Sequence, residues 1–342
     1  MPDNSRYSAS NIQLPSNLNP IQLRRENAAM YYGGNDGKAI QGLLISYIDF
    51  LLTTQHAQQI QITCLSTGGF VIQDVGSSIE SVAGCGLPTA ELLHVLGAAQ
   101  HCIIDLHHDG QHYQLSYNGE LTVPAVQLLG SSQANYRSIS FVPNHAIFIH
   151  RASSIHQLLG SLRGLATLFA GCRIEVIDQL HATINHLFYP NGPRDYLDEL
   201  IFNNLNSEPY LEFAGANEYV QLKIVLQFSH FSQIEQCLLR YRHVPFEPIY
   251  RQASLKGLAA GLTSYGQIHG KLADNQAIEP AQIRNFGCLI VLEQLAKSLQ
   301  DAGGRPSDPS IIAAAIQQLV QHQLPAQLAK LSAGEINQLV MW

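Results

Sequence analysis

The chain has 342 residues, enough for two domains of ordinary size, and 46% of its residues are hydrophobic. Only 13% are charged, and the formal net charge is -7, with the lysines and arginines few and scattered. These values exclude a disordered chain and provide no basic face, so we expect no autonomous binding to nucleic acid. The low charge favours a protein whose surface is partly covered by partners.

Cysteine usage and hydropathy indicate the compartment. Six cysteines occur without a Cys-x-x-Cys pair, mostly in apolar runs, which is typical of buried free thiols in a reducing environment. Residues 1–19 are polar and lack the apolar core of a signal peptide. No apolar run reaches the roughly 18 residues that a membrane span requires. The sequence therefore predicts a cytoplasmic protein without a membrane span.

Helices and antiparallel hairpins alternate in the first half of the chain. The spacing of apolar residues predicts helices at residues 23–30, 40–55, 89–99 and 154–169. Alternation with a period of two predicts strands at residues 59–64, 70–74, 102–106, 113–117, 138–141 and 173–178. Asp109-Gly110 lies between two of these runs and indicates a tight hairpin turn.

A second block of helices and strands follows a boundary near residue 180. Helices are predicted at residues 193–200, 253–265, 311–322 and 326–342. Asp308-Pro309 supplies a cap for the third of them. Strands are predicted at residues 219–228, 235–241 and 287–293. The whole pattern predicts two α+β domains, without an internal repeat.

Several stretches resemble the ATPase half of the B subunits of DNA gyrase and topoisomerase IV. Residues 6–12 are similar to the tyrosine-bearing arm of that family, and residues 19–33 are similar to its arginine-rich helix, with Ala28-Ala29 in place of Pro-Gly. Residues 72–79 look like its adenine-binding turn, Asp-x-Gly-x-Gly-Ile, and residues 90–96 resemble the helix that follows. The resemblance covers nearly the whole chain.

The resemblance implies a fold and a domain plan. The fold is a GHKL-ATPase-like antiparallel α/β sandwich, followed by a transducer-like α+β domain that contains a left-handed βαβ unit in the family. The plan places a dimerisation arm at residues 1–19, the ATPase-like domain at 20–180, and the transducer-like domain with a C-terminal helix at 181–342. It also implies a homodimer, or a heterodimer with a gyrase-type subunit, held partly by Tyr7, Ile12 and Tyr31.

ATP hydrolysis in such a fold requires a general base, a Mg²⁺ ligand, a glycine-rich lid and a lysine from the second domain. The resemblance places Leu43 at the position of the base and Tyr47 at that of the metal ligand, and neither side chain can do this chemistry. Asp49 lies about 200° around the helix from Tyr47. The lid is missing between the predicted helix 89–99 and the next strand, and Lys297, the remaining candidate lysine, is expected on the surface.

A remnant of the adenine-binding turn is retained at Asp74, Gly76, Ser78 and Ile79. Asp74 can still accept a hydrogen bond from an adenine amino group, although Ser78 narrows the space that a glycine would leave. Without phosphate contacts, such a site binds at roughly millimolar to high micromolar concentration. The alternative is that Asp74 is now only a turn or cap residue. We expect no cofactor beyond this weak adenine nucleotide binding.

A histidine-rich hairpin offers a competing interpretation. It carries His101, His107, His108 and His112 together with Asp105 and Asp109. A metal site needs three or four convergent ligands, whereas His107 and His108 point to opposite faces of a strand. His108 and His112 flank the turn and are the pair expected to approach each other. We therefore expect a solvated hairpin and no metal.

These observations favour a catalytically inactive pseudoenzyme that acts as a dimeric protein-binding scaffold or regulator, with an unidentified protein partner. Two alternatives stay open. One is a module that senses adenine nucleotide through Asp74 without hydrolysis. The other is an accessory subunit of a type II topoisomerase or another DNA complex.

Overall fold

The computed structural model describes residues 19–79, 81–149, 155–201, 209–228, 234–300 and 306–340. The chain divides into two compact units, one of Met1–Leu158 with Ile174–His186 and the other of Leu159–Arg173 with Leu187–Trp342. The chain passes between the units after residues 158, 173 and 186, so the expected boundary at residue 180 lies within a segment of the first unit. Within the described ranges, no helix is long and apolar enough to cross a membrane.

The first unit is built on an eight-stranded sheet, in the order β5-β4-β3-β6-β2-β1-β7-β8. Its strands are β1 (Gln59–Cys64), β2 (Phe70–Val75), β3 (Ala99–His108), β4 (Gln111–Tyr117), β5 (Gln127–Ser131), β6 (Tyr136–Pro143), β7 (Arg173–Asp178) and β8 (Thr183–Phe188). The pairs from β5 through to β1 are antiparallel. At the β3–β4 turn, Asp109 and Gly110 both have positive φ, as the expected two-residue hairpin requires.

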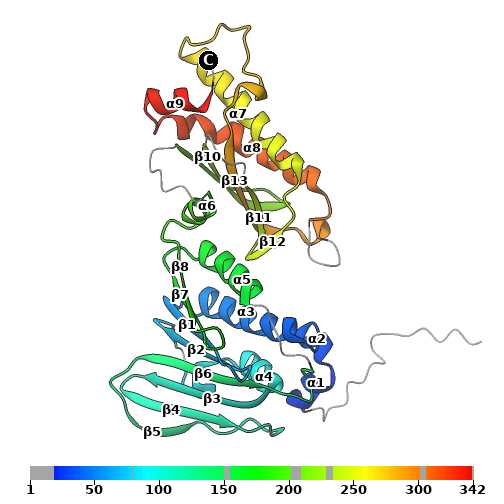
Figure 1. Cartoon of the computed structure of the whole chain (residues 1–342), viewed down its shortest axis with the longest axis vertical. Coiled ribbons are helices and arrows are strands. Elements are labelled where there is room, and N and C mark those ends of the chain that lie inside the picture. The colour runs from blue at the N-terminus through cyan, green and yellow to red at the C-terminus, as the bar shows by residue number, and fades with distance from the viewer. Residues whose placement is uncertain are drawn as a thin grey trace, which may run out of the picture. The chain divides into compact units, whose positions relative to one another are not determined.

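Helices α1 (Pro20–Glu26), α2 (Ala28–Tyr32), α3 (Gly37–Thr53) and α4 (Thr89–Ala98) belong to the first unit, and α3 and α4 pack on one face of its sheet (Figure 1). Asp36 caps α3 by accepting hydrogen bonds from the amides of Lys38 and Ala39. β6 shows how the sheet is buried on one side, because every second side chain is buried. The core of the unit therefore lies between α3 and the central strands.

The second unit has a five-stranded sheet in the order β12-β11-β13-β10-β9. Its strands are β9 (Tyr210–Ala216), β10 (Val220–Phe228), β11 (Glu235–Leu239), β12 (Arg242–Val244) and β13 (Phe286–Leu295), and its helices include α6 (Pro193–Ile201), α7 (Pro248–Ile268), α8 (Pro309–Leu328) and α9 (Ala333–Leu339). β11 and β13 are parallel and the other pairs are antiparallel. At Gly257 of α7 a Cβ atom would lie 2.8 Å from the Gln317 carbonyl oxygen of α8, so glycine permits the two helices to pack closely.

The α+β fold with a large antiparallel sheet is confirmed, and most predicted elements are present. Four strands were not predicted: β5, β8, β9 and β12. The predicted helix at 23–30 is wrong, because Asn27 separates α1 from α2. The single tail helix is also wrong, since α8 ends at Leu328 and α9 begins at Ala333. Helix α5 (Ile155–Leu168) has residues in both units.

Candidate functional site

Asp74 lies on β2 in the middle of the first sheet, directly opposite Arg137 of the neighbouring strand β6. Both side chains point into the core and each residue is only 1% exposed. The Arg137 Nε and Nη2 atoms donate to the two carboxylate oxygens of Asp74, each at 3.1 Å. The two residues therefore form a buried ion pair with two parallel hydrogen bonds, the strongest geometry available to this pair.

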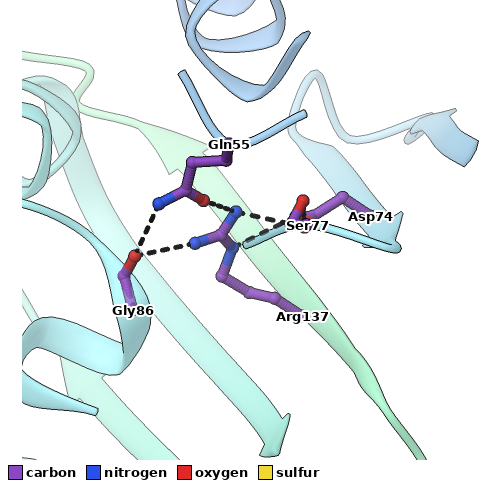
Figure 2. A network of polar contacts seen from close by, with 5 residues as sticks. All are labelled: Gln55, Asp74, Ser77, Gly86 and Arg137. Carbon is purple, nitrogen blue, oxygen red and sulfur yellow. Dashed lines mark hydrogen bonds and ion pairs between the residues drawn. The ribbon is translucent and has the colours of Figure 1, made fainter. Parts of the chain in front are cut away.

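The ion pair belongs to a closed network of five residues (Figure 2). The hydroxyl of Ser77 donates to Asp74 Oδ2 at 2.6 Å, so the carboxylate has three donors. The remaining guanidinium nitrogen, Nη1, donates to the Gly86 carbonyl oxygen at 3.0 Å, and Nη2 also donates to Gln55 Oε1 at 2.5 Å. The Gln55 amide donates to the same Gly86 oxygen at 3.0 Å. Each charged group is thus satisfied by protein partners.

Electrostatics holds Arg137 in its charged form. Burial alone lowers the pKa of its guanidinium, but the charge and the hydrogen bonds of the Asp74 carboxylate oppose burial, and the pKa is raised overall. Burial likewise raises the pKa of the Tyr47 hydroxyl, which stays neutral. Arg137 and Asp74 therefore neutralise each other, and the neighbouring Tyr47 hydroxyl is uncharged.

The other residues of the expected adenine turn lie outside this network. Gly76 is exposed and has φ +80°, and a Cβ atom there would lie 3.0 Å from the Gln58 side chain. Ser78 is exposed, and its amide donates to the Gln55 carbonyl oxygen at 2.7 Å. Ile79 is half-buried next to Gly86. The structure therefore keeps the turn but directs the Asp74 carboxylate inward to Arg137.

The positions expected for the base and the metal ligand are part of the core. Leu43 and Tyr47 are each 6% exposed on the face of α3 that packs against the sheet. With Phe70, Phe141 and their neighbours they leave a cavity of about 20 Å³, lined by apolar side chains and Tyr47. That volume is enough for roughly one water molecule. Asp49 is half-buried further along α3.

The remaining sites predicted from the sequence are placed as follows. α4 ends at Ala98 and β3 begins at Ala99, so no loop separates them where the lid was expected. Lys297 is exposed in a short 3-10 helix. Tyr31 is half-buried under the guanidinium of Arg24, 5.1 Å from its ring centre, while Tyr7 and Ile12 lie outside the described residues.

Comparison with known proteins identifies the fold. No family model matches the chain. It is 22% identical to the B subunit of DNA topoisomerase 4 from Enterococcus faecalis over 261 residues, which are 66% of this chain and 38% of that protein. It is 21% identical to the corresponding protein of Bacillus subtilis over 255 residues, 65% of this chain and 38% of that protein. The chain thus spans about two fifths of the length of these curated relatives.

Solved structures match over nearly the whole length. The 43K ATPase domain of Thermus thermophilus gyrase B, in complex with an aminocoumarin, superposes with a TM-score of 0.72 at 17% identity, covering 94% of this chain and 92% of that one. The chain has the fold of a gyrase B ATPase region. The topoisomerase IV ATP-binding domain of Francisella tularensis matches with a TM-score of 0.60 at 15% identity, covering 93% and 94%. The resemblance predicted from the motifs is confirmed at this level.

The histidine-rich hairpin of the gyrase-B-like chain differs from the expectation. His107 and His112, not His108 and His112, lie opposite each other, and their rings stack 4.1 Å apart. His112 Nε2 lies 2.8 Å from Asp105 Oδ1, and His107 Nδ1 lies 2.7 Å from the Ser132 hydroxyl. Among the residues that the structure describes, no group of three or more metal-ligating side chains converges.

Sequence reasoning missed Arg137 and Gln55. A signal for Arg137 was present, because it is two residues before Ile139 and four before Phe141 on a strand with alternating burial. This spacing places an arginine on the buried face, where it requires an acidic partner. The identity of that partner could not be read locally, since Asp74 is 63 positions away.

Proposed function

We propose that this gyrase-B-like chain is a catalytically inactive pseudoenzyme that acts as a dimeric, protein-binding scaffold or regulator. The observation that carries the proposal is the buried ion pair between Asp74 and Arg137. The carboxylate that resembles the adenine acceptor of the family already has three protein donors.

The energy of the ion pair supports this interpretation. A ligand that took Asp74 from Arg137 would leave a buried charge without its partner, which costs about 3–5 kcal/mol. The hydrogen bond from an adenine amino group returns only about 1.5–3 kcal/mol, the usual value for a bond to a charged acceptor. The ion pair between Asp74 and Arg137 should therefore be more favourable than a hydrogen bond from adenine to Asp74.

The packing of α3 supports the absence of hydrolysis. A general base must reach the attacking water within hydrogen-bonding distance, and a Mg²⁺ ligand must offer an oxygen to an open site. Leu43 offers neither group, and Tyr47 is buried against the ion pair. The cavity of about 20 Å³ beside them is far smaller than the 300 Å³ or more of ordinary ligand pockets.

The remaining role is binding to proteins. The resemblance to a family with a dimerising arm supports a homodimer, and the low content of charged residues, 13%, supports a surface that partners cover. Because nucleotide no longer drives closure in this proposal, the dimer should form without ATP. Neither unit is proposed to bind nucleic acid by itself.

Two measurements on the purified chain test the proposal. The first is ATP turnover at saturating Mg·ATP, with an active gyrase B ATPase domain as positive control; we expect the rate of the buffer blank. The second is sedimentation velocity without nucleotide, in which we expect a dimer. Turnover that Asp74→Asn abolishes, or a chain that dimerises only with ATP, would overturn the proposal.

A further inference from the structure

β9 is the edge strand of the second sheet, and its outer side is arranged to accept another strand. It pairs with β10 on one side only in the part of the chain that the structure describes. On the other side, the Gln323 side chain of α8 donates to the Ala214 carbonyl oxygen at 2.7 Å and accepts from the Ala214 amide at 3.2 Å. The side-chain amide thus makes the two hydrogen bonds that a peptide group of a neighbouring strand would make.

In an antiparallel strand, the backbone N–H and C=O groups of successive residues point alternately toward and away from the neighbouring strand. Because Ala214 bonds outward, the residues two positions away, Glu212 and Ala216, also direct their backbone groups outward. Among the described residues, no loop or turn backbone bonds to the Glu212 amide or carbonyl. An incoming strand would find an acceptor and a donor there, at a spacing that matches its own repeat.

Two hollows adjoin this edge and give the strand room. The first has a volume of 540 Å³ and is lined by Arg194, Tyr210, Ala214 and Lys330 among others. The second has a volume of 210 Å³ and is lined mainly by apolar side chains, including Leu222 and Leu319. Gln323 lines both, so together they follow β9 from Tyr210 to Asn217.

The charges of the first hollow indicate the chemistry of the occupant. Three cations line it, Arg194, Lys223 and Lys330, against a single carboxylate, Glu212. Lys223 is paired with Glu293 at 2.6 Å. Asp198 attracts Arg194, whose exposed guanidinium stacks on the Tyr210 ring. Arg194 and Lys330 are both exposed where they line this hollow, and their positive charges can attract carboxylates.

We propose that the β9 edge binds an extended acidic peptide segment of a partner protein by strand addition, with acidic side chains at Arg194 and Lys330 and an apolar side chain in the second hollow. The inference rests on the proposed protein-binding function and gives that function a location and a class of partner. Gln323 holds the place of the incoming peptide group until the segment displaces it. The main-chain bonds supply affinity, and the two hollows supply selectivity.

The test uses the full chain and a fluorescent ten-residue peptide of alternating glutamate and valine. Glu212→Pro removes the outward amide at an edge position that tolerates proline, whereas Glu212→Thr removes the same carboxylate and keeps the amide. We expect Glu212→Pro to weaken binding about tenfold or more relative to Glu212→Thr. An N-methylated peptide, which cannot pair along one edge, should bind as weakly to the unchanged protein, so the test stands even where the proline variant does not fold.

Charge is tested in parallel. The double variant Arg194→Glu, Lys330→Glu should lose binding by about tenfold or more, whereas Lys256→Glu, on an exposed position of α7, should bind like the unchanged protein. Equal binding of a lysine–valine peptide, equal binding by the proline and threonine variants, or competition by a single-stranded oligonucleotide would each overturn the inference. If the chain turns over ATP but still binds the peptide, only the proposed pseudoenzyme function is overturned. If it neither turns over ATP nor binds the peptide, only the proposed binding site at the β9 edge is overturned.

Discussion

Asp74 and Arg137 meet across the neighbouring strands β2 and β6 in an ion pair from which solvent is excluded, with both side chains at most 1% exposed. Such a pair contributes little net stability when it is compared with apolar residues of the same volume. It strongly disfavours any arrangement that separates its members, however, and in the proposed function this property keeps the Asp74 carboxylate from a ligand.

The first prediction concerns one half of the ion pair. Arg137→Met should lower the free energy of unfolding of the first unit by about 3–5 kcal/mol, because the Asp74 carboxylate remains buried without its cation. The double variant Asp74→Leu, Arg137→Met should be less destabilised than Arg137→Met alone, since no charge is left in the core. Urea unfolding followed by circular dichroism measures both. A double variant that is worse than the single one would contradict the ion-pair account.

A second prediction concerns an attempt to restore the base. Leu43→Glu should give no ATP turnover and should destabilise the first unit by at least about 3 kcal/mol, because the new carboxyl group is buried among apolar side chains. Ser46→Glu, on the exposed side of the same helix, is the matched control and should change stability by about 0.5 kcal/mol or less. Thermal and urea unfolding distinguish the two. A stable Leu43→Glu protein would mean that α3 is not packed as described.

Two glycines of α5 give a third, paired prediction. A Cβ atom at Gly164 would lie 2.2 Å from the Tyr241 carbonyl oxygen, whereas one at Gly160 would meet no atom within 4 Å. Gly164→Ala should therefore destabilise the second unit by about 1–3 kcal/mol. Gly160→Ala should stabilise it by about 0.5–1 kcal/mol, since alanine favours a helix. Similar effects at both positions would show that α5 does not pack on the β11–β12 turn.

The fourth prediction is a dependence on pH at Asp178. Burial alone raises the pKa of this carboxyl group, but hydrogen bonds from the His181 ring and from the backbone amides of Leu180 and His181 outweigh burial and lower the pKa. The folded-state pKa is thus below the unfolded value of about 3.9. The stabilisation is complete above about pH 4 and is lost as the pH falls further through the folded pKa.

Asp178→Asn provides the measurement. The difference in unfolding free energy between the unchanged protein and this variant should stay constant from neutral pH to about pH 4, then shrink toward pH 3. A difference that does not shrink between pH 4 and pH 3 would contradict the lowered pKa of Asp178.

The sequence predicted the elements with strong local signals. Asp109-Gly110 marked its hairpin, and Asp308 caps α8 through the Ser310 amide as expected. β9 was missed because its sequence, Tyr210–Ala216, ends in small residues that give no alternating pattern. Its strand conformation depends on pairing with β10, which a local pattern does not reveal.

The site illustrates the same limit. The turn containing Asp74 was found from its motif, and burial of the replaced positions Leu43 and Tyr47 follows from their apolar helix face. The partner of Asp74 could not be found, because strand order decides which residue of β6 faces it. A one-residue change of register would have turned Arg137 to the opposite face of the sheet.

Thermal unfolding of the purified chain with millimolar Mg·ATP, Mg·ADP or adenosine shows whether it binds nucleotide, because any ligand that binds only the folded state raises its stability. Because Arg137 holds Asp74, we expect no change in the unfolding midpoint of either unit with any of the three. A saturable increase in the unfolding midpoint that is larger for ATP than for adenosine would mean that the chain binds both the adenine and the phosphates. That result would contradict the proposed loss of nucleotide binding.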